Sequence, residues 1–246
     1  DGLRRHGQCY PANRGLCRPL VRAMLGASRF DAMEAVAPVD IATPHIDVVH
    51  DDAHTVVVNK PAGLLSVPGL TGAPDLQSMM QARFGARTLV AHRLDQATSG
   101  LLACAKTPGA LRFLQRMFAE RRVAKTYEAL LDGEIEGASG EVNLPLFLDP
   151  LDRPRQCVDA RGKPSLTGWE KVAVDDGKTR VLFTPHTGRT HQLRVHAAHR
   201  DGLGTPIVGD ELYGSPGDRL LLHARDLHLP QLHSKAMLQL RAPTPF

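Results

Sequence analysis

Two apolar runs joined by a short charged turn, between residues 88 and 105, constrain the fold of this chain more than any other stretch. The first run covers residues 88–91 and the second covers residues 101–105. Short apolar runs bounded by turn residues are typical of strands. The turn between them carries Arg93 and Asp95, so the two strands would hold a guanidinium and a carboxylate at one rigid edge of a sheet.

Asp95 has two interpretations on this pattern alone. It is the only carboxylate between Asp75 and Glu120. Aspartates in turns most often accept hydrogen bonds from the backbone, and Thr98 and the residues after it are also turn formers. A carboxylate held between two strands is equally suited to catalysis. The residue pattern leaves both interpretations open.

Composition is that of an ordinary globular protein. The 246 residues suffice for one large domain or two small ones. No run approaches the roughly 20 apolar residues of a membrane span, and the N-terminus lacks a continuous apolar segment, so we expect neither a membrane partner nor a signal peptide. The four cysteines show no C-x-x-C spacing, so we expect reduced thiols and a cytoplasmic location. The formal charge of +4 permits a nucleic-acid partner without establishing one.

The hydrophobic pattern predicts more strands than helices. We expect helices over residues 76–84 and 108–122, and a third from an N-cap at Thr190 to about residue 201. The expected strands are residues 54–60, 88–91, 101–105, 123–131, 165–174, 179–184, 219–224 and 236–240. Because these strands follow one another in hairpin-like order, we expect an α+β fold with a mixed, mainly antiparallel central sheet flanked by helices and loops.

The first 40 residues differ from the rest. They carry turn formers and charge without a period, and only residues 20–36 have apolar residues at helical spacing. We therefore expect residues 1–40 to form a poorly ordered arm and residues 41–246 to form one folded domain.

Two groups of arginines are candidates for phosphate contact. Arg112, Arg116, Arg121 and Arg122 lie mostly away from the apolar stripe of the predicted second helix, and Arg153 and Arg155 lie in a basic loop. Such residues usually form a solvated surface, and contact with RNA phosphates is the alternative.

Four histidines between residues 186 and 199 raise the question of a metal site. No cysteine or carboxylate lies among them, and they lack the H-E-x-x-H spacing of zinc hydrolases. We therefore expect no metal, and we expect these histidines and Gln192 to fix neighbouring loops by hydrogen bonds.

Five stretches, in the right order, resemble the motifs of the RluA family of pseudouridine synthases. Residues 92–102 read HRLDQATSGLL and resemble the aspartate signature of that family. The others are VNKPAG at 58–63, KTY at 125–127, TGRTHQLR at 187–194 and RLLLHA at 219–224. The resemblance extends over about residues 48–246. Many family members carry an N-terminal S4 domain, which residues 1–40 do not resemble.

The resemblance implies an isomerase that converts uridine to pseudouridine in structured RNA, in 23S ribosomal RNA or a transfer RNA anticodon stem-loop or both, without a cofactor. It implies that Asp95 is the nucleophile, that Arg189 pairs with it, and that Tyr127 stacks on the uracil and assists removal of the C5 proton. It further implies that Arg93 fills the gap left by the flipped base and that Leu222 lines the pocket. We expect the protein to act as a monomer.

Two other functions remain alternatives. The first is a non-catalytic RNA-binding protein or RNA chaperone on the same fold, against which the presence of Asp95, Tyr127 and Arg189 argues. The second is a hydrolase that uses Asp95 with the histidine cluster, which a stoichiometric bound metal would support.

Overall fold

The computed structural model describes residues 45–234 and 236–246, so the predicted arm and the helix expected over residues 20–36 lie outside the described residues. Its elements, in chain order, are β1 (Asp47–Asp51), β2 (Thr55–Lys60), α1 (Leu76–Phe84), β3 (Leu89–Val90), β4 (Ser99–Ala105), α2 (Pro108–Ala119), β5 (Ala124–Leu131), β6 (Ser139–Asn143), β7 (Leu146–Leu148), β8 (Gln156–Val158), β9 (Leu166–Asp175), β10 (Lys178–Pro185), α3 (Gln192–Ala198), β11 (Leu222–Pro230) and β12 (Met237–Arg241). None of the helices in the described part of the chain is long and apolar enough to cross a membrane.

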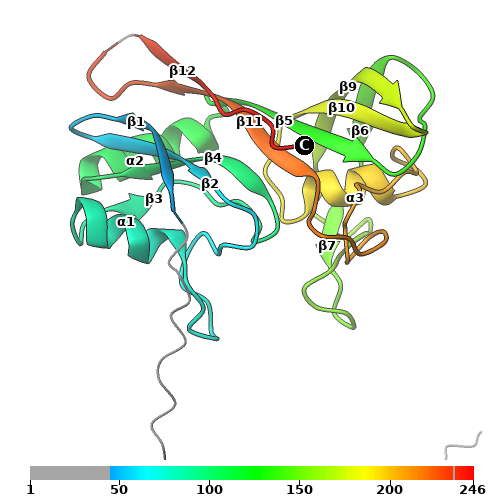
Figure 1. The fold of residues 1–246 in the computed structure, drawn as a ribbon, viewed down its shortest axis with the longest axis horizontal. Helices are drawn as coiled ribbons and strands as arrows, with labels where there is room; N and C mark the ends of the chain where they lie inside the picture. Colours follow the sequence, from blue (N-terminus) through cyan, green and yellow to red (C-terminus); the bar gives the residue numbers. More distant parts are fainter. Residues whose placement is uncertain (1–44, 235) are drawn as a thin grey trace, which may run out of the picture. The chain divides into compact units, whose positions relative to one another are not determined.

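The predicted mixed, mainly antiparallel sheet is confirmed. Ten strands form one sheet in the order β1-β2-β4-β11-β5-β10-β9-β6, with β12 paired to β11 and β3 paired to β4. Among its paired strands, only β4 and β11 run parallel. Figure 1 shows α1 and α2 against one half of this sheet and α3 against the other, with β5 and β11 between the halves.

Strand β4 is covered on both faces, which explains its unbroken apolar sequence. Leu101 and Ala103 pack with α2 residues such as Leu114, whereas Leu102 and Cys104 pack with α1 residues such as Met80. All seven residues of the strand are buried. A strand buried on both faces needs apolar residues at every position rather than at alternate ones.

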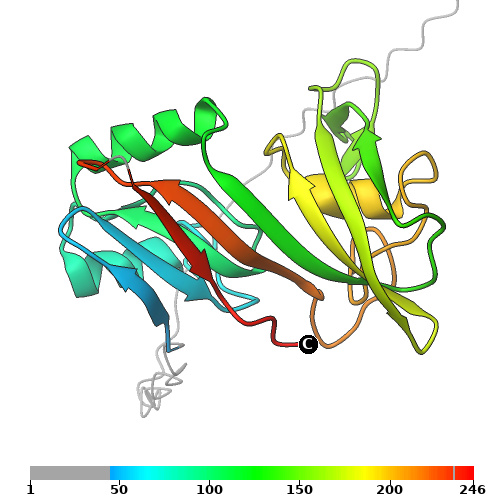
Figure 2. The same cartoon turned by 90° about the horizontal axis from the view of Figure 1, so that it is seen from above.

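The helices begin where their capping residues predict. The Asp75 side chain accepts the backbone N–H of Ser78 at the start of α1, and Thr107 accepts that of Ala110 at the start of α2. Pro108 occupies the first turn of α2, where its missing N–H costs nothing. Figure 2 shows α2 alongside the sheet and the chain passing directly from its end into β5.

The bounds of the predicted elements agree with the structure to within three residues except at the end of β11, and the shifts of α3 and β11 have identifiable causes. Helix α3 begins at Gln192 rather than after Thr190, because the Gln192 side chain accepts the N–H of Arg189 and leaves Thr190 in the preceding turn. Strand β11 covers Leu222–Pro230 rather than residues 219–224. The sequence did not predict the second half of this strand because Asp226 interrupts its apolar pattern. In the structure that carboxylate is paired with Arg225 and Arg241, so the strand tolerates the charge. Strands β6, β7 and β8 lie in a Gly- and Pro-rich stretch where no strand was expected.

Gly100 is required where β4 and β11 meet. Its φ of +112° is unfavourable for other residues, and an added Cβ would overlap the Ala224 backbone. We expect Gly100→Ala to lower the free energy of unfolding by about 3 kcal/mol in urea titrations. Gly109→Ala, in the first turn of α2 with open space around it, is the control and should not destabilise the protein. Equal stability of the two variants would contradict this packing constraint.

Candidate active site

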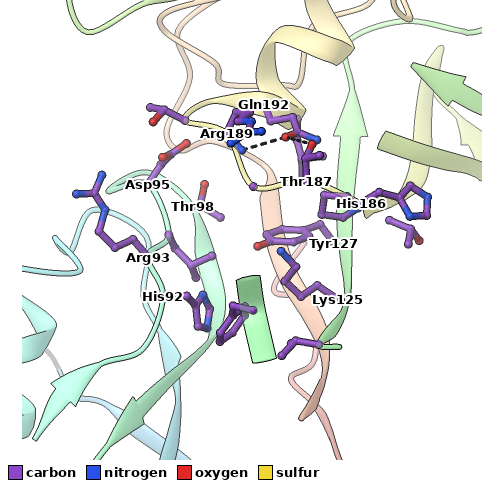
Figure 3. Close-up of a pocket in the computed structure, with 18 of the residues that line it drawn as sticks. His92, Arg93, Asp95, Thr98, Lys125, Tyr127, His186, Thr187, Arg189 and Gln192 are labelled. Carbon is purple, nitrogen blue, oxygen red and sulfur yellow. Dashed lines mark hydrogen bonds between the residues drawn. The ribbon is translucent and has the colours of Figure 1, made fainter. Parts of the chain in front are cut away.

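A cavity of about 980 Å³ lies between the β3–β4 turn and the segment that joins β10 to α3, with β5 between them. Asp95, Arg93 and Thr98 come from the first side, Tyr127 and Lys125 from β5, and His186, Thr187, Arg189 and Gln192 from the other side, as Figure 3 shows. Residues from four of the five motifs therefore share one cavity, and only the VNKPAG stretch does not line it.

The Asp95 turn is fixed by a buried lysine. The Nζ of Lys60 donates hydrogen bonds to the carbonyl oxygens of Pro61 at 2.9 Å, Leu64 at 2.8 Å and Gln96 at 3.1 Å. The Gln96 carbonyl also accepts the N–H of Gly63 at 2.8 Å. Lys60 thus joins the end of β2 to the residue that follows Asp95, and it holds the Asp95 backbone in place.

Burial lowers the pKa of Lys60 to about 7, and the negative charge of Asp95 opposes this shift. Three carbonyl acceptors match the three protons of an ammonium, whereas a neutral amine has only two. The hydrogen bonds therefore favour the cation, which lies within the electrostatic reach of the Asp95 carboxylate.

The interpretation of Asp95 as a turn cap is wrong for its side chain. The backbone carbonyl of Asp95 accepts the N–H of Thr98 at 3.1 Å, so the backbone alone closes the turn. Within the described residues, the carboxylate forms no hydrogen bond or ion pair. Asp95 is half-buried and lines the cavity, so its oxygens are available to a bound molecule.

Tyr127 is the aromatic residue of the β5 wall. It is half-buried and lies opposite Phe183 of β10 and Ala224 of β11. Burial raises the pKa of Tyr127 above its usual range, and the charge of Asp95 raises it further. Tyr127 is therefore a neutral phenol at physiological pH. Lys125, two residues before Tyr127 on β5, also lines the cavity.

His92 anchors the start of the Asp95 turn. Its Nε2 accepts the N–H of Ala103 at 3.1 Å, and its ring packs on Phe118 with centroids 4.5 Å apart. Burial lowers the pKa of His92 to about 3, and the nearby Lys125 charge lowers it further. Burial also lowers the pKa of Lys125. A neutral His92 therefore holds the turn to β4 without adding charge to the cavity.

Arg189 reaches the cavity but does not form the expected ion pair. Its Nε donates to the carbonyl of Pro164 at 3.1 Å, and the side chain is exposed. No ion pair of 4.0 Å or less joins it to Asp95 in the described residues. Figure 3 shows the two side chains on facing loops of the same cavity. The predicted pairing is thus absent from the described structure, although both partners line the site.

The predicted hydrogen-bonding role is confirmed for Gln192, His191, His196 and His199, whereas the His186 side chain forms no hydrogen bond among the described residues. The Gln192 amide joins Thr187 at 2.7 Å, the Leu166 carbonyl at 3.0 Å and Thr167 at 2.9 Å. His196 bonds Ser165 at 2.9 Å. No group of three or more His, Cys, Asp or Glu side chains among the described residues could hold a metal ion.

A buried ion pair supports the far wall of the cavity. Arg194 of α3 donates to Asp210 through Nε at 2.8 Å and through a terminal nitrogen at 2.6 Å, and both side chains are almost fully buried. The same carboxylate accepts the N–H groups of Leu212 and Tyr213. The Tyr213 hydroxyl then lies 2.8 Å from Nδ1 of His191, which lines the cavity beside Arg194. Neither Asp210 nor Tyr213 was predicted from the sequence.

The remaining predicted residues divide into two sets. Arg93, which is exposed, and Leu222, which is buried at the start of β11, both line the cavity. Four arginines that were expected to contact phosphates do not line it, namely Arg112, Arg116, Arg153 and Arg155. Arg155 instead pairs with Asp152 at 2.8 Å.

Four cationic residues that line the cavity were not assigned to the site from sequence, namely Arg121, Arg122, Lys125 and Arg194. For the first three the available signal was position, because Arg121 and Arg122 end the predicted basic helix and Lys125 belongs to the KTY motif. Asp95 is the only carboxylate among the described residues that line the cavity.

The cavity combines one available carboxylate, an aromatic wall and a surplus of cations on an α+β fold. This combination is that of an enzyme that uses a carboxylate as its reactive group on a polyanionic substrate. Residues 54–199 match the RNA pseudouridylate synthase family. The chain belongs to this family and is an RNA pseudouridine synthase, an isomerase that acts on uridine in RNA.

Curated relatives and solved structures agree with this assignment. The chain is 45% identical over 213 residues to the dual-specificity RNA pseudouridine synthase RluA of Pasteurella multocida, covering 82% of this chain and 95% of the relative. It is 42% identical over 212 residues to the RluA protein of Escherichia coli strain K12, with the same coverage. The structure of human RNA pseudouridylate synthase domain containing 1 superposes with a TM-score of 0.71 at 31% identity, over 82% of this chain and 84% of that one.

Proposed function

We propose that this enzyme isomerises uridines in both a transfer RNA stem-loop and 23S ribosomal RNA. Similarity over most of the chain to proteins named dual-specificity RNA pseudouridine synthases supports this assignment. The observation that carries the proposed isomerase chemistry is the cavity, in which a carboxylate with no partner among the described residues, an aromatic ring and several cations surround a space of about 980 Å³. That volume suits an extruded nucleotide with its flanking phosphates.

The reaction breaks the bond between ribose C1′ and uracil N1 and forms a bond from C1′ to C5. C5 loses a proton, N1 gains one, and no electrons are exchanged with a redox partner. In this proposal Asp95 is the nucleophile, acting at the ribose or at the uracil. Arg189 approaches Asp95 when RNA is bound, Arg93 occupies the place that the flipped base leaves, and Leu222 forms part of the pocket wall. Arg153 and Arg155 remain predicted contacts to RNA outside the cavity, and Arg112 and Arg116 are the rival to the phosphate contact that is argued and tested below.

We propose that Tyr127 stacks on the uracil and relays the C5 proton as a neutral phenol. Because its pKa is raised, the rate should show no activation between roughly pH 8 and pH 10 that depends on Tyr127. Tyr127→Phe should lower kcat by about 100-fold without changing the shape of the pH–rate profile. An alkaline rise that disappears in Tyr127→Phe would identify the phenolate as the base, and an unchanged kcat would limit Tyr127 to stacking.

We further propose that the enzyme acts as a monomer in the cytoplasm, and the presence of Asp95, Tyr127 and Arg189 in one cavity of a single chain supports the monomer. The test of function is release of tritium from uracil C5 in labelled transfer RNA and ribosomal RNA transcripts, assayed in parallel. Release from both supports dual specificity, and release from one restricts the substrate to that RNA. No release from either, with RNA binding intact, would favour a non-catalytic RNA-binding role.

A further inference from the structure

The turn that joins α2 to β5 presents two adjacent arginines at the edge of the cavity. Arg121 and Arg122 are both exposed, and both line the cavity. The N–H of Arg122 bonds the carbonyl of Met117 at 2.9 Å, and that of Arg121 bonds Phe118 at 3.1 Å. These backbone bonds close the end of α2 and fix the direction in which the chain leaves the helix.

Arg121 occupies a position that favours glycine. Its φ is +58°, in the left-handed region, and helices closed in this way most often have glycine there. A long cationic side chain in a backbone conformation that disfavours it is an observation that calls for a functional explanation.

Neither arginine is neutralised by the part of the chain that the structure describes. Their side chains form no ion pair or hydrogen bond within residues 45–234 and 236–246. Other arginines of the fold do have such partners. Arg180 and Arg225 pair with Glu128, and Arg194 pairs with Asp210.

The cavity around these arginines has a large excess of positive charge. Arg93, Lys125 and Arg189 also line it, and Asp95 is the sole carboxylate among the described lining residues. An uncompensated group of cations beside a nucleotide-sized cavity attracts a polyanion and lowers the affinity for neutral or cationic ligands.

We propose that Arg121 and Arg122 bind the phosphodiester groups of the RNA strand next to the uridine in the cavity, and that the α2–β5 turn thereby positions this nucleotide. The inference rests on the proposed function. It assigns the phosphate contact to the end of α2 rather than to Arg112 and Arg116, which lie earlier on the helix and outside the cavity. Contacts to phosphates position the RNA on the protein but do not depend on the base sequence. One turn can therefore bind two RNA substrates of different sequence.

The test compares three double variants in binding a fluorescent RNA stem-loop across a series of salt concentrations. Arg121→Gly/Arg122→Ala should weaken binding about tenfold at low salt and reduce the slope of log affinity against log salt by about 1.5, since each lost contact to single-stranded RNA contributes about 0.7. Its thermal stability should be retained, because glycine suits the left-handed position. The control, Arg87→Ala/Arg200→Ala, removes two exposed arginines that do not line the cavity and should leave the slope unchanged.

The third variant, Arg112→Ala/Arg116→Ala, tests the rival assignment. A loss of affinity and slope equal to that of the turn variant would assign the contact to the whole face of α2 and overturn the proposal. So would wild-type affinity in the turn variant.

Replacing the phosphodiester beside the modified uridine with a neutral methylphosphonate tests where the contact lies in the RNA. This replacement should weaken the binding of the RNA to the wild-type protein and should have little further effect on its binding to Arg121→Gly/Arg122→Ala. Fully additive losses would contradict the contact. Tritium release by the wild type reports separately on the proposed function, so the two failures are distinguishable.

Discussion

Asp95→Asn is expected to lower turnover by about 1,000-fold or more while leaving the fold and RNA affinity almost unchanged. The amide is the same size as the carboxylate but is not a nucleophile. No hydrogen bond or ion pair within the described residues depends on the Asp95 side chain, so the substitution breaks no described contact. Tritium release from C5-labelled RNA measures turnover, thermal unfolding measures the stability of the fold, and a binding titration measures RNA affinity.

Asp218→Asn is the matched control for this prediction. Asp218 is exposed, lies outside the cavity and has no ion pair in the described part of the chain. It should retain wild-type turnover. Substantial tritium release by Asp95→Asn would remove Asp95 from the role of nucleophile.

Asp210→Asn is expected to lower the free energy of unfolding by about 3–5 kcal/mol, because it leaves the buried Arg194 guanidinium without its counter-charge. Burial alone lowers the pKa of Arg194, but its hydrogen bonds and the charge of Asp210 more than offset this, and the net pKa is raised. Urea titration measures the loss, again with Asp218→Asn as the control.

The Asp210 variant should also disturb the far wall of the active site. Asp210 holds the backbone of Tyr213, and the Tyr213 hydroxyl contacts His191 at the cavity. We therefore expect reduced turnover even at temperatures where the variant is folded. A variant of unchanged stability would show that solvent or another group neutralises Arg194.

Local chemistry allowed much of the fold to be predicted. The limits of α1 follow from the Asp75 cap and the apolar spacing of Leu76 and Met80, and the continuous apolar sequence of β4 follows from burial on both faces. Strands β6 to β8 were not predicted because they are short and lie among glycines and prolines. The strand β11 was placed too early because its paired charges interrupt the apolar pattern.

The site residues that belong to a sequence motif were predicted. The contacts that only the tertiary structure brings together were not. Asp95, Tyr127 and Arg189 share the cavity as the resemblance implied. The hydrogen bond from Arg189 to Pro164 and the contact of Lys60 with Gln96 join residues that are 25 and 36 positions apart. No local period or propensity specifies such contacts, so the sequence alone could not predict them.

The position of β11 between β4 and β5 has a consequence for biosynthesis. A ribosome makes β4 and β5 well before residues 222–230, yet the two strands are joined in the sheet only through β11. Until that segment emerges, both strands have an unpaired edge, and the two halves of the cavity have no common sheet. Such non-local pairing slows folding and exposes edges that can aggregate. The two halves of the sheet can therefore join only after this late central strand has been made.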